Sequence, residues 1–121
     1  MILVDTSVWV NHLRSSNPVL TKLLNNNQVL MHPMIIGELA CGNLNNRALL
    51  LELWNNLSFC AASTDKEALY FLEHYNLSGR GIGYIDIHLL ASTAFVPGAK
   101  LWTNDKRLRD ISQELYLNPS S

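Results

Sequence analysis

Short apolar runs alternate along this chain with longer stretches in which apolar residues recur every three or four positions. A short continuous apolar run is typical of a strand that is buried on both faces of a parallel sheet, whereas the longer spacing is typical of an amphipathic helix. The runs predict strands at residues 1–4, 29–31, 57–61 and 100–102, with an additional edge strand at 115–117. The longer stretches predict helices from residue 6 or 7 to 13 and at 18–24, 34–41, 47–57, 64–75, 84–95 and 106–111.

Capping and turn residues support several of these boundaries. Thr64 and Glu67 have the spacing of a capping box, Pro18 suits the first turn of a helix, and Gly42 suits the end of one. Strands that alternate with helices indicate an α/β fold, in which a mostly parallel central sheet of four to five strands is flanked by helices in a three-layer sandwich. With 121 residues, the chain has the size of one domain, residues 1–121.

The composition excludes several classes of protein. No apolar run approaches the roughly 18–20 residues that a membrane helix needs, and Met1 leads into an apolar run without the basic region of a secretory signal. The two cysteines are too few for a disulfide scaffold and lack the spacing of zinc ligands. We therefore expect a cytoplasmic protein without a membrane anchor.

Two acidic residues follow predicted strands. Asp5 comes directly after the first strand, and Asp105 follows the strand at 100–102 after two further residues. Ligands of open α/β sheets bind beyond the carboxyl ends of the strands, so both acids are expected at the functional edge of the sheet. Each could instead cap the helix that follows it.

Two further acids, Glu38 and Asp86, lie inside apolar helical stretches. Each could occupy the polar stripe of an amphipathic helix, or all four acids could converge on one pocket. Clustered carboxylates stay ionised only when a cation neutralises them. Hard oxygen donors without paired His or Cys indicate Mg²⁺ or Mn²⁺ rather than zinc.

The net charge of −1 would hide an uneven distribution if the acids converge. The chain has ten Asp and Glu residues and nine Lys and Arg residues, so removing four acids to one pocket leaves six acids against nine cations. The remaining surface would then be mildly basic. An acidic pocket in such a surface fits a metal site that faces a phosphate backbone.

Four short motifs match, in order, the motifs of a known family. They are DTSVW at residues 5–9, GELACG at 37–42, GIGYIDIHLLAS at 81–92 and LWTND at 101–105. With these motifs the chain resembles the PIN-domain ribonucleases along essentially its whole length, and specifically the VapC toxins of VapBC toxin–antitoxin pairs.

This resemblance implies a PIN-like fold and an endoribonuclease that uses Mg²⁺ or Mn²⁺. The acidic site would consist of Asp5, Glu38, Asp86 and Asp105. Of these, Asp5 and Asp86 match the usual metal-contacting acids, whereas Thr6 and Thr103 match hydroxyl positions that either orient a water or carboxylate or cap their turns. The resemblance also implies a homodimer that a VapB-type antitoxin binds and silences. The alternative is a PIN-like module that binds without catalysis, and the complete set of acids argues against it.

Three basic residues are candidates for contacts with RNA. Arg80, Lys106 and Arg107 could contact RNA phosphates or could simply form a solvated face. The glycine-rich residues 79–83 follow a predicted helix and not a strand, so we interpret them as a lead-in to the helix of Asp86 rather than as a dinucleotide-binding loop. The three tryptophans, Trp9, Trp54 and Trp102, are interpreted as core residues rather than as stacking platforms.

Two other classes of α/β protein with acidic pockets fit less well. A receiver-type signalling domain needs two adjacent acids near the first strand, whereas residues 2–7 contain Asp5 alone. A phosphatase of the haloacid-dehalogenase type needs a second Asp two residues after the first, and this chain has Ser7 there.

Overall fold

The computed structural model describes residues 1–119 and contains a four-stranded sheet in which every pair of neighbouring strands is parallel. The strands are β1 (Ile2–Val4), β2 (Val29–Met31), β3 (Ser58–Phe59) and β4 (Lys100–Trp102), in the order β3-β2-β1-β4. Leu3 on β1 is aligned with Leu30 on β2 and with Leu101 on β4. The central position of β1 places its carboxyl end between those of β2 and β4.

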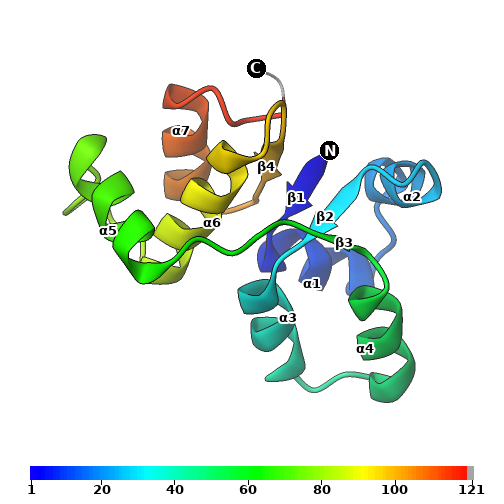
Figure 1. The fold of residues 1–121 in the computed structure, drawn as a ribbon. Helices are drawn as coiled ribbons and strands as arrows, with labels where there is room; N and C mark the ends of the chain where they lie inside the picture. Colours follow the sequence, from blue (N-terminus) through cyan, green and yellow to red (C-terminus); the bar gives the residue numbers. More distant parts are fainter. Residues whose placement is uncertain (120–121) are drawn as a thin grey trace.

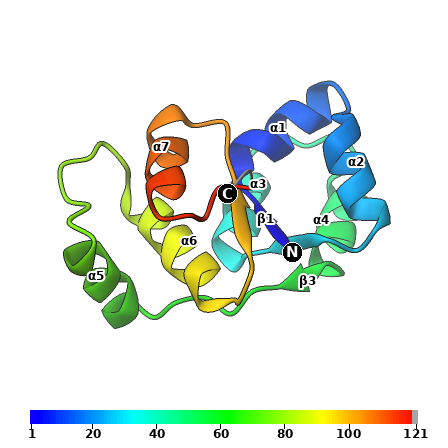
Figure 2. The ribbon, with the colours of Figure 1, turned by 90° about the horizontal axis from the view of Figure 1, so that it is seen from above.

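Seven helices in the described part of the chain surround this sheet. They are α1 (Thr6–Arg14), α2 (Pro18–Asn25), α3 (Pro33–Ala40), α4 (Arg47–Asn55), α5 (Asp65–His74), α6 (Tyr84–Phe95) and α7 (Lys106–Glu114). Figures 1 and 2 show α1, α2 and α4 on one side of the sheet and α5, α6 and α7 on the other. The predicted α/β three-layer arrangement is therefore confirmed.

The most deeply buried helix is α6. Seven consecutive residues, from Ile87 to Thr93, are buried, and this helix packs against both β4 and α5. A helix that is buried nearly all round is apolar on most of its faces, which explains why the segment looked so apolar in the sequence. The only acid in its first turn, Asp86, therefore lies at the edge of the core.

The prediction of a strand at residues 115–117 is wrong. Leu115 ends α7, and Tyr116 has a φ of 58°, in the left-handed region that an extended strand does not use. Two hydrogen bonds join this turn to β4, from the Leu101 backbone N–H to the Leu117 carbonyl (2.6 Å) and from Lys100 Nζ to the Tyr116 carbonyl (2.8 Å). The sheet of the described residues therefore has four strands, at the lower end of the predicted range.

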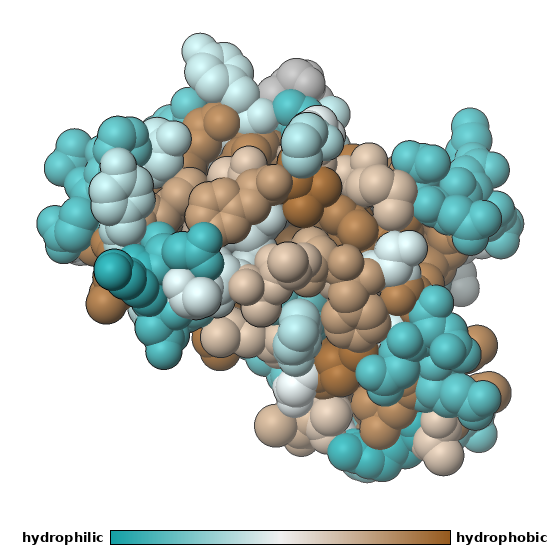
Figure 3. All heavy atoms as spheres, viewed as in Figure 1, coloured by the Kyte–Doolittle hydropathy of each residue, from teal (hydrophilic) through white to brown (hydrophobic). Residues whose placement is uncertain are grey.

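The surface of the described residues is partly apolar. Figure 3 shows an apolar area across the middle of one face, with hydrophilic residues at its two ends. Exposed aromatic side chains on α5 and α6 include Tyr70, which is 68% exposed, and Phe95, which is 52% exposed. Within residues 1–119, none of the helices is long and apolar enough to cross a membrane.

Candidate active site

Asp5 lies where β1 ends and α1 begins, and two hydroxyl groups hold its carboxylate. The Asp5 backbone N–H donates to the Trp102 carbonyl (2.9 Å), which continues the β1–β4 ladder by one residue. Thr103 Oγ1 donates to Asp5 Oδ2 (2.7 Å), and Ser7 Oγ donates to the same oxygen (3.0 Å). Asp5 is only 7% exposed. A buried carboxylate with its orientation fixed by two donors is well placed to bind a ligand with the other oxygen.

Asp105 is tied to the same hydroxyl groups. Its backbone N–H donates to Thr103 Oγ1 (3.1 Å), and the neighbouring Asn104 N–H donates to Ser7 Oγ (3.0 Å). The Asp105 Oδ1 accepts from the Leu108 N–H (2.9 Å), so this acid caps α7 as well as standing at the sheet edge. The two alternatives that the sequence left open for Asp105 are thus both present.

Glu38 reaches the same region from α3. It is exposed, and its Oε1 accepts a hydrogen bond from Thr6 Oγ1 (2.8 Å). Thr6 is the first residue of α1, whose N-cap is Asp5, and no side-chain bond caps that helix. The Thr6 hydroxyl therefore orients a carboxylate, which is one of the two roles that the sequence left open for it.

Asp86 is the third residue of α6, where its Oδ2 accepts from the Gly83 N–H (3.2 Å). Burial raises the pKa of the Asp86 carboxyl above its ordinary value of 3.8, and the hydrogen bond from Gly83 offsets part of this effect. Repulsion from the other three acids, Asp5, Asp105 and Glu38, raises the pKa further. The structure therefore brings the other three predicted acids within electrostatic reach of Asp86, and we call the four acids the carboxylate cluster.

The donor chemistry of the carboxylate cluster fits Mg²⁺ or Mn²⁺, because it consists of hard oxygens alone. Each hydrogen bond described above engages one oxygen of its carboxylate and leaves the other for a cation. Within residues 1–119, however, no three acidic, histidine or cysteine side chains are placed to hold one ion together. Like charges without a cation between them repel, so the acids would have to move closer together to hold one ion.

The three basic residues predicted near RNA differ in their surroundings. Arg80 forms a two-pronged ion pair with Glu114 (2.8 and 3.1 Å), and Lys106 pairs with Asp110 (3.1 Å). The Arg107 side chain packs over Gly81, which has a φ of +82°, in the loop that leads to Asp86. Of these three residues, Arg107 is therefore the one that packs against the loop leading to Asp86.

A groove of about 600 Å³ opens beside Glu38, between α1, α3 and the segment that connects α3 to α4. Thr6, Glu38 and Arg14 contribute polar groups to it, and Leu13, Leu49 and Leu50 contribute apolar ones. The groove gives the cluster an open side that a chain could enter.

Sequence reasoning assigned no site role to Ser7, yet its hydroxyl contacts Asp5 and the loop before Asp105. Its place two residues after the first acid was the available signal. That position served only to exclude a phosphatase, which needs a second Asp there.

A second polar group consists of His32, Ser63, Asp65, His88 and Ser92, and we call it the histidine–serine network. His88 Nδ1 is 2.7 Å from Ser63 Oγ, and His88 Nε2 is 3.0 Å from Asp65 Oδ1. Ser92 Oγ accepts from the Ser63 N–H (2.9 Å) and lies 3.1 Å from His32 Nε2. The network therefore runs through the core from α3 to the start of α5.

His32 anchors this network to the start of α3. It is fully buried, and its Nδ1 accepts from the Met34 N–H (3.1 Å), so it caps α3. Burial lowers the pKa of His32 to about 4, and the nearby His88 lowers it as well. His32 is therefore neutral at physiological pH, as a capping acceptor must be.

Comparison with known proteins identifies the family of this chain. The family model for the PIN domain matches residues 2–114. Two curated relatives, both called Ribonuclease VapC32 and both from Mycobacterium tuberculosis (strains CDC 1551 / Oshkosh and ATCC 25618 / H37Rv), are 46% identical to this chain over 114 residues. The matched region covers 94% of this chain and 92% of each relative.

Proposed function

Because this chain belongs to the PIN-domain family, and to its VapC branch, we propose that it is a metal-dependent endoribonuclease that acts as the toxin of a toxin–antitoxin pair. One observation carries the proposal: three acids from separate elements, Asp5, Glu38 and Asp105, each lie close enough to Asp86 to raise the pKa of its carboxyl. Such a cluster costs free energy unless it serves a cation.

In the proposed mechanism, Asp5 and Asp86 hold the ion, and Glu38 and Asp105 complete the acidic site. When bound, Mg²⁺ or Mn²⁺ supplies positive charge that stabilises the charge developing on the phosphate and promotes ionisation of the attacking water. The chain itself supplies orientation, which accounts for much of the effect of a well-positioned catalytic group.

That orientation comes from hydroxyl groups. Thr103 and Ser7 fix Asp5 and the loop before Asp105, and Thr6 fixes Glu38. Each of these donors lies at a strand end or at the start of a helix, so the backbone fixes the position of each donor. We therefore regard the three hydroxyls as positioning groups.

The partners follow from the same proposal. We expect an RNA substrate and a VapB-type antitoxin, which would both meet the protein in the cytoplasm. We also expect a homodimer, and the apolar area of Figure 3 is the kind of surface that a protein contact covers. Sedimentation should then detect a dimer at tens of micromolar, a concentration estimated as ample for an obligate dimer.

The test is cleavage of a labelled RNA after treatment with EDTA, followed by separate addition of Mg²⁺, Mn²⁺ and Ca²⁺. Activity should return with Mg²⁺ or Mn²⁺ and stay low with Ca²⁺, because calcium prefers longer and looser coordination than magnesium. Full activity in EDTA would contradict metal catalysis. A cyclic-phosphate product would indicate attack by the 2′-hydroxyl of the RNA. The absence of cleavage with every metal would favour the silent binding module.

A further inference from the structure

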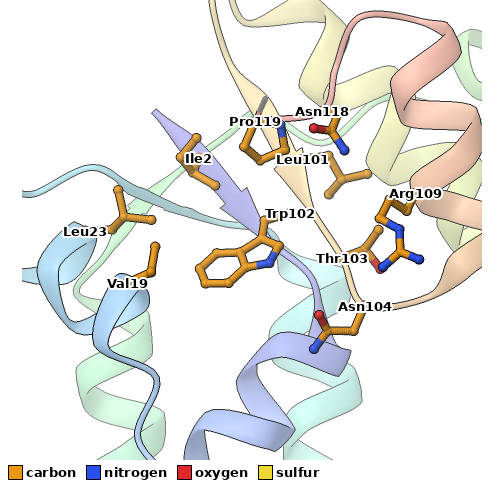
Figure 4. A pocket seen from close by; sticks show the side chains of 10 residues that line it. All are labelled: Ile2, Val19, Leu23, Leu101, Trp102, Thr103, Asn104, Arg109, Asn118 and Pro119. Atoms are coloured by element: carbon orange, nitrogen blue, oxygen red, sulfur yellow. The ribbon is translucent and has the colours of Figure 1, made fainter. Parts of the chain in front are cut away.

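A second pocket lies beside β4, next to the carboxylate cluster. It has a volume of about 380 Å³, within the range of about 300–1,000 Å³ that is typical of ligand sites. Figure 4 shows Trp102 at its centre, with Val19 and Leu23 of α2 on one side and Arg109 of α7 on the other. The described residues that line it are Ile2, Val19, Leu23, Leu101, Trp102, Thr103, Asn104, Arg109, Asn118 and Pro119.

The three tryptophans of this chain have different environments. Trp9 and Trp54 are 2% and 4% exposed and pack edge to face with ring centres 5.9 Å apart, as expected for core residues. Trp102 is only partly buried, and its indole lines the pocket. The interpretation of all three as core residues therefore holds fully for two of them.

The pocket continues directly from the carboxylate cluster. The Trp102 carbonyl accepts from the Asp5 N–H, and the Thr103 hydroxyl donates to the Asp5 carboxylate. Asn104 lines the pocket and is bonded covalently to Asp105. Neighbouring residues are about 3.8 Å apart along the backbone, so a group in the pocket would lie within a nucleotide's length of the acids.

The chemistry of the lining is specific. An indole offers a flat apolar face, Arg109 offers a cation, and the Asn104 side chain offers both a donor and an acceptor. Among the described lining residues there is no acid, although the cluster next to the pocket is entirely acidic. A flat group with hydrogen-bonding edges that is attached to negative charge satisfies all of these features.

We propose that this pocket binds an unpaired nucleobase of the RNA substrate, stacked on Trp102 and held at its edge by Asn104 and Arg109. The inference rests on the proposed ribonuclease function and names a determinant of its substrate selection. Proteins that recognise single-stranded RNA stack unpaired bases on aromatic side chains or on Arg and read the edges with polar groups.

Fluorescence tests the stacking without any need for cleavage. Because Trp9 and Trp54 are buried, Trp102 is the tryptophan that added RNA can quench. The full-length Asp5→Asn variant, which should not cut its ligand, is titrated with single-stranded RNA pentamers of A, C or U. Quenching is expected, and it should disappear when Trp102→Phe is added, a change that keeps a ring in place. Quenching that survives Trp102→Phe, or no quenching with any pentamer, would overturn the assignment.

Kinetics test the contribution to RNA binding. Loss of base stacking costs about 1–3 kcal/mol, so Trp102→Leu should raise KM by about 5- to 150-fold with little change in kcat. Trp102→Phe should have a smaller effect, and Arg109→Ala should also raise KM. Lys22→Ala is the matched control, because it removes a cation from α2 at a position that does not line the pocket. An unchanged KM in Trp102→Leu would contradict the proposal.

The ribonuclease function and the base pocket can be refuted independently of each other. Quenching without cleavage by the unaltered protein would refute the ribonuclease function and leave the base pocket supported. Cleavage with neither quenching nor a change in KM would refute the pocket alone. If Trp102→Leu weakened binding of a protein partner and spared RNA cleavage, the pocket would be a protein-docking site and our assignment would be wrong.

Discussion

Two polar regions meet on α6 and differ in the partners that surround their polar groups. Asp86 belongs to the carboxylate cluster and His88, two residues later, to the histidine–serine network. With 3.6 residues per turn, side chains two residues apart point to nearly opposite faces of a helix. One face of α6 therefore carries a carboxylate close to three other acids, and the other carries an imidazole ring with a partner on each nitrogen.

This difference distinguishes the carboxylate cluster, which has a role in activity, from the histidine–serine network, which has a role in stability. In the network, buried polar atoms are satisfied by the chain itself, which is the usual condition of a stable core. In the cluster, the charges raise the free energy of the folded protein until a cation arrives. Removing a group from the histidine–serine network should lower stability, and removing a group from the carboxylate cluster should lower activity.

The largest expected effect is on catalysis. Asp5→Asn and Asp86→Asn should each lower the rate of RNA cleavage on the order of 10³-fold or more, since a bound metal contributes several kcal/mol to the transition state. Without metal, the melting temperature of each variant should be equal to or higher than that of the unaltered protein, because one repulsive charge is gone. Glu52→Gln on α4 is the control and should change neither property. Near-native cleavage by either Asn variant at saturating Mg²⁺ would remove that acid from the site.

The opposite result is expected in the network. Ser92 is fully buried, and Ser92→Ala would leave the Ser63 N–H and His32 Nε2 without this partner. Each orphaned buried group costs about 1–3 kcal/mol, so loss of a partner for both groups should lower the free energy of unfolding by about 2–6 kcal/mol. Urea denaturation would measure this, with the exposed Ser78→Ala as the control. Unchanged stability with a loss of cleavage would reverse our division of the two regions.

Acid should affect the two regions in opposite directions. The unfolded chain binds a proton at His32 near pH 6.5, whereas the folded protein does so only near pH 4, so this group lowers stability as the pH falls from about 6.5 to 4. The difference of about 2.5 pKa units corresponds to at most about 3 kcal/mol. Asp86, with its raised pKa, adds stability as the pH falls through that pKa towards 3.8.

Two variants separate these contributions in unfolding measurements across pH without metal. His32→Asn keeps a capping acceptor at the start of α3 and should flatten the loss of stability below pH 6.5. Asp86→Asn should leave that loss in place and abolish the opposing gain. A His32→Asn profile identical to that of the unaltered protein would show that His32 is not the group responsible.

The smallest effects concern two glycines beside the cluster. A Cβ on Gly81 would lie 2.5 Å from Arg107 Nη1 at a φ of +82°, so Gly81→Ala should cost about 1–2 kcal/mol of stability. A Cβ on Gly37, inside α3, would meet nothing within 4 Å, so Gly37→Ala should add about 0.5–1 kcal/mol. Thermal unfolding of both variants would check this. A stabilising Gly81→Ala would mean that the loop before Asp86 does not need its left-handed turn.

The sequence predicted those parts of the molecule that depend on local pattern. The convergence of Asp5 and Asp105 follows from parallel strands, whose carboxyl ends meet at one edge. The inclusion of Glu38 and Asp86 was only one of two alternatives until the motifs were considered. The turn at 115–117 was missed because its apolar residues have the pattern of a strand, and nothing in that pattern reveals the positive φ of Tyr116.

The network and the Trp102 pocket could not be predicted in this way. The partners of His88 and His32 lie 23 to 60 positions away along the chain, and serine and histidine are common enough that no spacing singles them out. The exposure of Trp102 depends on how α2 and α7 sit beside the sheet, which a one-dimensional pattern does not contain.

The hydrogen bond between Thr103 and Asp5 joins residues 98 positions apart. A ribosome that synthesises this protein makes the first acid early, together with Thr6 and Ser7, but the strand and hydroxyl that fix that acid come late. Contacts between distant parts of a chain form only after both parts exist. During most of translation the nascent chain therefore has no assembled acidic site. The acidic site can therefore assemble only after synthesis has passed β4.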